Sequence, residues 1–415
     1  MARPTNVSKS FARTLPALGA ILAFLAFLGF AAGWEAQGAD SSAGSNVQYR
    51  GSLNNCRTEF EKQKKGHVAF IGGSITEMKG YRPMVCEILK RRFPDTQFTF
   101  TDAGISSTCS TTGAFRLEKD VLSKGPVDLF FIEFAVNDDQ DAAHARRECI
   151  RGMEGMIRHC RKHNPNMDIV ITHFCNPGMI ETIQAGKTPL SSGSHEEVAG
   201  HYDISSINLA KEVAGQIKAG KLTWEKFGGT HPKPFGNTLC AGMIDRLMGT
   251  AWKEPLAKDA QKHPHPMPEK PLDENNYAQG RFIDPAKAKI KKGWVLHTPP
   301  WKDLPGNCRG RFAKCKLLCA DEPGDELTLE FSGKAIGAYV LAGPDAGIVE
   351  AGIDGGPVKT VDLFHRFSRG LHYPRTVMFD ADLKPGKHTL RLRMSDKKNP
   401  ASRGHAMRIL EFAVN

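Results

Sequence analysis

The chain has 415 residues and a formal net charge of +11, with apolar and charged fractions typical of a globular protein. A chain of this length is too long for one ordinary hydrophobic core, so we expect two domains. No nucleic-acid-binding motif and no interleaving of basic and aromatic residues accompanies the positive charge, which argues against a nucleic acid as partner.

Residues 1–38 have the pattern of an export signal. Arg3, Lys9 and Arg13 precede an uncharged run over 17–34, and small residues around position 37 suit cleavage after Gly38. Cleavage removes three basic residues and one acidic residue, so the mature charge is +9, which favours anionic surroundings such as acidic polysaccharide. We therefore expect a secreted or periplasmic protein. Because the apolar run is just long enough to span a bilayer, an uncleaved membrane anchor is the alternative.

Strand and helix patterns alternate through residues 48–253. The expected strands lie at 67–71, 97–102, 127–136 and 168–174, and helical patterns lie at 81–93, 113–122, 142–163 and on both sides of 202–207. The run at 127–136 is almost continuously apolar, as in a strand that is buried on both faces. This alternation predicts an α/β domain in which helices cover both faces of a parallel sheet.

The amino-acid composition and the periodicity of the sequence change after this domain. Residues 254–275 are rich in proline, lysine and polar residues, which is typical of a linker. Over 276–415, strand-like runs separated by Gly, Pro and Asp turns predict an all-β sandwich. Trp294 and Trp301 near its start can stack on a sugar ring or fill the core, and core packing is the favoured role.

The ten cysteines are even in number, and export permits disulfides. Cys308, Cys315 and Cys319 are close enough in sequence for one local bridge. No CxxC pair is present, and the His-Pro-His-Pro segment at 263–266 lies in the linker and is interpreted as merely polar. We therefore expect no metal.

Four positions that suit acyl transfer follow the predicted strands or precede the last helix. Ser74 follows the first strand, Gly104 the second and Asn137 the third, while His231 comes just before the last helix. Ligands of an open parallel sheet bind beyond the carboxyl ends of its strands, so we expect these residues to meet. His231 can take the proton of Ser74, although Ser74 alone could equally be a helix cap. The amides of Ser74 and Gly104 and the side chain of Asn137 can hold an oxyanion.

This set of residues resembles the SGNH, or GDSL-type, hydrolase superfamily, which is named for these four residue types. The resemblance covers about residues 65–250. It implies a flavodoxin-like three-layer fold for the domain at 48–253 and a serine esterase that needs no cofactor. The first block reads GGSIT in place of GDSL, a variant frequent in secreted sugar esterases of the family, and Ala135 stands where glycine is usual.

Position 228 is the most serious departure from the family pattern. The family usually has an aspartate three residues before the histidine, and here that residue is Gly228. The aspartate fixes the imidazole tautomer and stabilises its charged form. Without it, Ser74 and His231 form a dyad whose ring is held by a backbone carbonyl, or another carboxylate replaces the aspartate. The candidates for that carboxylate are Glu225, Asp138 and Asp102.

Four further side chains are weighed for roles near the site. Arg116, His173 and His201 are candidates for substrate binding, although each has a more ordinary interpretation as a surface or core residue. Cys109 would be a nucleophile only beside a base and in electropositive surroundings, and the sequence gives no sign of either.

The sequence thus predicts a secreted serine esterase that removes acyl groups, acetyl being favoured, from a polysaccharide or glycoside through an acyl-enzyme. The same residues cleave any ester, so a lipid or thioester acylhydrolase is the first alternative. The second is a non-catalytic glycan-binding protein on the same fold. We expect no stable membrane insertion unless the signal stays uncleaved.

Overall fold

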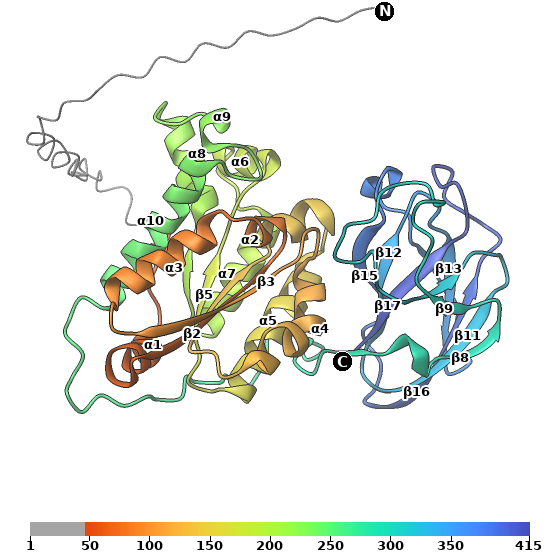
Figure 1. The fold of residues 1–415 in the computed structure, drawn as a ribbon, viewed down its shortest axis with the longest axis horizontal. Coiled ribbons are helices and arrows are strands. Elements are labelled where there is room, and N and C mark those ends of the chain that lie inside the picture. Colours follow the sequence, from red (N-terminus) through yellow and green to blue (C-terminus); the bar gives the residue numbers. More distant parts are fainter. Residues whose placement is uncertain (1–45) are drawn as a thin grey trace, which may run out of the picture. The chain divides into compact units, whose positions relative to one another are not determined.

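The computed structural model describes residues 46–415 (Figure 1). The expected export signal and the alternative of an uncleaved anchor fall outside these residues. None of the helices within 46–415 has both the length and the apolar character that crossing a membrane requires.

A six-stranded sheet forms the centre of the first domain, in the order β1-β6-β5-β4-β2-β3. Neighbouring strands run parallel, except that β1 is antiparallel to β6. The inner strands β2, β4 and β5 are buried almost throughout, as expected for a sheet covered on both faces. The strands are β1 (Val47–Gln48), β2 (Lys65–Gly72), β3 (Gln97–Gly104), β4 (Leu129–Glu133), β5 (Asp168–Thr172) and β6 (Ser205–Ile207).

Helices cover both faces of this sheet because successive strand residues point to opposite sides. Val68 and Phe70 pack in one cluster with α3, α8 and α10, whereas Ala69 and Ile71 pack in another with α4, α5 and α7 (Figure 1). The helices are α1 (Asn54–Thr58), α2 (Ser74–Glu77), α3 (Tyr81–Arg92), α4 (Ser110–Asp120), α5 (Arg146–His163), α6 (Pro177–Gln184), α7 (Leu190–His201), α8 (Leu209–Lys218), α9 (Trp224–Phe227) and α10 (Pro234–Ala251), with π-helical turns η2 (Glu59–Gln63) and η4 (Asn137–Asp141).

Two antiparallel sheets form the second domain. Their orders are β15-β12-β17-β10-β9, with β7 also paired to β17, and β14-β13-β16-β11-β8. Trp294 is 3% exposed in the core between them, the role that the sequence favoured. The predicted α/β domain followed by an all-β sandwich is therefore confirmed. The strands are β7 (Arg281–Ile283), β8 (Lys289–Lys292), β9 (Val295–His297), β10 (Leu317–Ala320), β11 (Glu326–Gly333), β12 (Ile336–Ala342), β13 (Ile348–Ile353), β14 (Lys359–Asp362), β15 (Tyr373–Asp380), β16 (Gly386–Met394) and β17 (Met407–Val414).

The proline-rich segment 254–275 is tied to the first domain by its side chains and backbone. His265 Nε2 lies 2.6 Å from Oδ1 of Asp168, which is fully buried. The carboxylate of Glu154 accepts the backbone amides of Leu272 and Asp273. The interpretation of residues 263–266 as merely polar is therefore wrong for His265, because its ring is the partner of a buried carboxylate.

All ten cysteines lie within the described residues and all are free. The local bridge considered for Cys308, Cys315 and Cys319 does not form. Cys319 is buried in β10, with its sulfur bonded to the Leu317 carbonyl.

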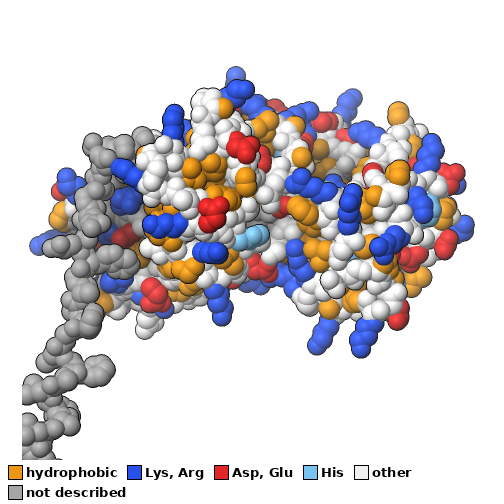
Figure 2. All heavy atoms as spheres, turned by 90° about the horizontal axis from the view of Figure 1, so that it is seen from above, with side chains coloured by type: hydrophobic (Ala, Val, Ile, Leu, Met, Phe, Trp, Pro, Cys, Tyr) orange, Lys and Arg blue, Asp and Glu red, His pale blue; other side chains and the backbone are white. Residues whose placement is uncertain are grey.

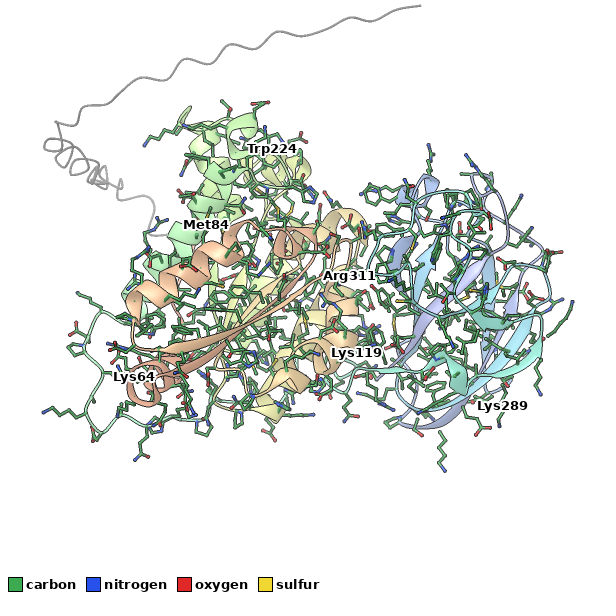
Figure 3. The ribbon with its side chains drawn as sticks, in the orientation of Figure 1. Lys64, Met84, Lys119, Trp224, Lys289 and Arg311 are labelled. Atoms are coloured by element: carbon green, nitrogen blue, oxygen red, sulfur yellow. The ribbon has the colours of Figure 1, made fainter. Side chains whose placement is uncertain are left out.

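The β-sandwich contacts the first domain through α4, α5 and the loops after β2 and β3. Thr112 of α4 bonds to Thr376 at 2.9 Å, and Lys119 pairs with Glu411 at 2.7 Å. Arg311 pairs with Glu77 at 3.2 Å. Figure 3 shows Lys119 and Arg311 at this boundary. These contacts bring side chains of the β-sandwich to the carboxyl edge of the parallel sheet.

The Arg151 guanidinium, which is only 1% exposed, should be a large contributor to stability. It pairs with Asp273 of the segment 254–275 and with Asp382 of the β-sandwich, and so joins α5 to both. We expect Arg151→Gln to lower the free energy of unfolding by about 3 kcal/mol, because it breaks a buried ion pair. Chemical denaturation measures this.

Arg146→Gln is the matched control, since Arg146 lies on the same helix, is 59% exposed and pairs with Glu197. Its loss should cost less than about 1 kcal/mol. Equal effects of the two substitutions would contradict the assignment of Arg151.

Candidate active site

Ser74 and His231 meet at the carboxyl edge of the parallel sheet. Ser74 is the first residue of α2, directly beyond β2, and His231 lies three residues before α10. The Ser74 Oγ is 2.7 Å from Nε2 of His231. The Ser74 side chain does not cap α2, so the alternative of a helix cap does not hold. Ser74 is half-buried and His231 is exposed, so the pair is open to a ligand.

Asn137 lies against the glycine that precedes Ser74. A Cβ atom at Gly73 would lie 2.0 Å from Oδ1 of Asn137, so only glycine permits this approach. The Asn137 Nδ2 donates one hydrogen bond to the carboxylate of Asp141. Because a side-chain amide has two N–H groups, one remains for a ligand.

The expected oxyanion donors are unequally available. The Ser74 N–H begins α2, and the first amides of a helix have no partner within it. The Gly104 N–H, by contrast, donates to Oδ1 of Asp102 at 3.0 Å, and Asp102 also pairs with Arg82. The Ser74 amide and Asn137 are therefore the two donors that a ligand can reach without displacing an existing bond.

Gly228 cannot be replaced by the family's aspartate without a clash. It ends α9 with φ at +109°, and a Cβ atom there would lie 2.1 Å from the Lys233 amide nitrogen. Among residues 46–415, no group forms a hydrogen bond with Nδ1 of His231. The expectation that a backbone carbonyl or a displaced acid holds this nitrogen is therefore wrong.

The three proposed substitutes for the acid all lie elsewhere. Glu225 is exposed on α9 and forms no bond with His231. Asp102 is occupied by Arg82 and the Gly104 amide, and Asp138 is fully buried among other partners.

Asp141 is the acidic residue that sequence reasoning missed. Burial raises the pKa of its carboxyl, while its bond to Asn137 and the charge of His231 oppose this rise. The Asp141 carboxylate therefore interacts electrostatically with His231. The run Asn137-Asp138-Asp139-Gln140-Asp141 contained the signal, because three of the four residues after the oxyanion asparagine are acidic.

Asp138 ties together the elements beneath the site. Its carboxylate accepts the Ser110 amide at 2.8 Å, the Ser110 hydroxyl at 2.6 Å and His195 Nε2 at 2.8 Å. Burial by itself raises the pKa of Asp138, but His144 and His195 outweigh it and hold the pKa well below its usual range. The start of α4 is thereby fixed to η4, which carries Asn137.

The three candidates for substrate binding have other roles. Arg116 is 1% exposed and donates to the carbonyls of Ala103 and Gly72, so it is neither a solvated charge nor free to bind a ligand. His173 is fully buried and bonds to Glu196 at 2.9 Å. His201 Nε2 bonds to the Lys270 carbonyl at 2.9 Å, so it contacts the segment after α10.

Loops of the β-sandwich complete the surroundings of the site. Arg309 donates to the Ser106 carbonyl and the Ser107 hydroxyl, which lie just after Gly104. A cavity of about 600 Å³ is lined by Asp141, Asn176 and the backbone around Gln140 from the first domain, and by His365 and Arg366 from the second. Its walls combine these polar side chains with apolar ones, among them Ala142, Pro177 and Phe364.

Restoring the family's aspartate at position 228 should lower activity rather than raise it. The left-handed φ and the contact with the Lys233 amide both oppose a side chain there. We expect Gly228→Asp to reduce ester hydrolysis at least tenfold, because Lys233 and the preceding His231 must shift. Hydrolysis of a generic acetyl ester measures this.

Gly229→Asp separates the steric clash from backbone strain. Gly229 also has a positive φ, at +90°, but no atom lies within 4 Å of its Cβ position. This variant should retain most of the activity. An increase in activity for Gly228→Asp would contradict the structure.

The buried Asp138–His195 pair should make stability depend on pH. Burial lowers the pKa of His195, but its bonds to Asp138 and Cys149 outweigh this and raise the pKa to about 9. A histidine whose pKa is higher in the folded protein than in the unfolded chain stabilises the fold fully below the unfolded pKa of about 6.5. This stabilisation is lost as the pH rises toward the pKa of the folded protein. Burial raises the pKa of Glu133 to about 7, so this residue makes the fold less stable as the pH rises to about 7 and adds little further change above it.

We therefore expect the wild type to lose at least about 1 kcal/mol more stability between pH 7 and 9 than His195→Gln loses. Denaturation curves at several pH values measure it. His201→Gln, a change of a histidine outside the core, should keep the wild-type slope. Parallel slopes for wild type and His195→Gln would exclude a charged His195.

Comparison with known proteins agrees with this geometry. Residues 70–239 match the GDSL-like Lipase/Acylhydrolase family. No curated protein sequence matches the chain. The fold is similar to two crystal structures of a two-domain esterase (CEX) active on acetylated mannans, one of them co-crystallised with mannopentaose.

The structure with mannopentaose has 21% sequence identity and a TM-score of 0.71, and the match covers 89% of this chain and 96% of that one. The other has 22% identity, a TM-score of 0.72 and coverage of 89% and 97%. At this identity the likeness establishes the two-domain fold. Residues 70–239 match the GDSL-like lipase/acylhydrolase family, also called SGNH, and the β-sandwich domain follows that segment in the chain.

Proposed function

We propose that this protein is an esterase that removes acetyl groups from an acetylated polysaccharide, with mannan the favoured class. The observation that carries the proposal is the 2.7 Å contact between Ser74 Oγ and His231 Nε2. The structural relative active on acetylated mannans supports the choice of substrate.

The proposed reaction runs through an acyl-enzyme. His231 Nε2 takes the proton of Ser74 as its oxygen attacks the ester carbonyl. The Ser74 amide and the second N–H of Asn137 stabilise the oxyanion, and the carboxylate of Asp141 stabilises the imidazolium. His231 then gives its proton to the sugar oxygen as the C–O bond breaks, so the sugar leaves as an alcohol, and a water molecule activated by the same ring releases acetate.

Polar side chains among the lining of the cavity favour a sugar over a lipid. A lipid ester requires an apolar groove for its chain, whereas Asp141, Asn176, His365 and Arg366 line the cavity described above. The second alternative, a glycan-binding protein without activity, is disfavoured because Ser74 is accessible and already bonded to its base.

Secretion stays part of the proposal, and it rests on the export pattern of residues 1–38. Figure 2 shows Lys and Arg side chains spread over the viewed face rather than gathered in a single patch. A spread of this kind suits a long anionic or neutral polymer in the surroundings better than one small charged ligand.

Ser74→Ala should abolish release of acetate from acetylated mannan while the protein stays folded, because the hydroxyl fills no core. Release of acetate, with circular dichroism as the test of folding, measures this. Ser123→Ala changes an exposed serine and should keep full activity.

Substrate class is tested with the same preparation. Acetylated mannan should be hydrolysed at least ten times faster than an ester of a long-chain acid. Faster hydrolysis of the long-chain ester would favour the lipid alternative, and equal activity of Ser74→Ala and wild type would exclude Ser74 as nucleophile.

A further inference from the structure

A second potential nucleophile, Cys109, lies outside the Ser74 pair. Cys109 is the residue directly before α4 and is 6% exposed. Its sulfur, one ring nitrogen of His144 and one carboxylate oxygen of Asp138 all lie within 4.8 Å of one another. The cluster therefore has the composition of a thiol, base and acid that act together.

The carboxylate of this cluster is fixed in place. Ser110 and His195 hold Asp138 with three bonds of 2.6 to 2.8 Å. Oδ1 of Asp138 lies 3.4 Å from Nδ1 of His144. A fixed carboxylate beside one ring nitrogen orients an imidazole and stabilises its charged form.

The surroundings of the thiol favour its ionised form. Burial alone raises the pKa of Cys109, but the charge of the nearby His144 outweighs burial and lowers the pKa. The pKa of His144 rises well above its usual value for the same reason, although burial opposes the rise. Cys109 also lies at the N-terminus of an 11-residue helix, whose dipole stabilises a thiolate.

A cavity of about 370 Å³ gives access to this thiol. Cys109 and His144 line it from the first domain, and Tyr373 and Arg375 line it from the second. Within residues 46–415, the Arg375 guanidinium has no ion pair or side-chain hydrogen bond, so an unpaired cation stands beside the cluster. The titratable and charged groups around the thiol are His144, Asp138, Asp141, Glu148, Tyr373 and Arg375.

We propose that Cys109, His144 and Asp138 form a reactive thiolate site that takes small electrophiles, hydrogen peroxide among them, from this cavity. With peroxide, the sulfur attacks one oxygen, an S–O bond forms and the O–O bond breaks. The thiolate is oxidised by two electrons to sulfenic acid, and the peroxide is reduced. His144 gives its proton to the departing hydroxide, which leaves as water.

A metal ion is the rival occupant, since thiolate, imidazole and carboxylate are all metal ligands. The bonding of Asp138 argues against it. Oδ1 already accepts the Ser110 amide and faces His144, and Oδ2 accepts the Ser110 hydroxyl and His195. An ion would therefore compete with three existing hydrogen bonds of this carboxylate.

The test is the pH dependence of alkylation by iodoacetamide, measured on the intact protein by peptide mapping. The pH at half-maximal rate is independent of how accessible the sulfur is. We expect this midpoint to lie below the ordinary thiol value of about 8.5 for Cys109. The half-exposed Cys315 serves as internal reference. A Cys109 midpoint at or above 8.5 would overturn the proposal, whatever the variants do.

Two variants assign the effect to the cluster. His144→Gln should raise the Cys109 midpoint by about one unit or more, and His388→Gln, which changes a histidine paired with Asp354, should leave it unchanged. An unchanged midpoint in folded His144→Gln would refute the role of His144. Ser74→Ala should keep the wild-type midpoint, which separates this site from esterase activity.

Two further measurements distinguish the occupants. After exposure to peroxide, dimedone should label Cys109 in the wild type but not in Cys109→Ser. If the protein contains stoichiometric zinc and Cys109 is alkylated only after the zinc is chelated, the cluster is a metal site and the proposal of a reactive thiol is wrong. Absence of dimedone labelling at Cys109 would overturn the peroxide step.

Discussion

The buried carboxylate of Asp138 joins the start of α4, the π-helical turn η4 and helix α7, because Ser110, its own backbone and His195 come from these three elements. A carboxylate without solvent needs such donors, and their number leaves it little freedom to move. Asn137 is the preceding residue in the chain, so the bonds that fix Asp138 also restrain the position of the oxyanion asparagine. The same carboxylate faces His144 and thereby Cys109. One charge thus positions groups in both candidate sites.

The Ser74–His231 pair works without an aspartate at the usual position, since the chain at Gly228 turns with a positive φ and brings the Lys233 amide into that space. Asp141, which follows Asn137 by four residues and bonds to it, instead supplies a negative charge that interacts with the imidazole. Asp141 acts through the field and not through a bond to Nδ1. Such a ring is less constrained than that of a full triad, so slower turnover is expected.

The alternation of strands and helices could be predicted from the sequence because the period of the apolar residues reflects which of them are buried. The residues that follow the strands could then be assigned to the carboxyl edge of the parallel sheet. Partners distant in sequence could not be read in this way. Arg116 looked like a helix surface charge, yet it bonds to two strand carbonyls, and His265 in a proline-rich segment meets Asp168. Strand β15 contains Pro374 and was not predicted, because proline is tolerated there only through the position of β15 at a sheet edge.

The central claim is that Ser74 carries the acyl group. Rapid quenching of the enzyme during turnover of an acetyl ester, followed by peptide mapping, locates that group. The account predicts an acetyl group on Ser74 in the wild type. In His231→Gln, the base that activates water is lost, so an acetyl group placed on Ser74 by a chemical reagent should be hydrolysed more slowly than in the wild type. Acetyl on Cys109 or on another residue, with none on Ser74 during full turnover, would contradict it.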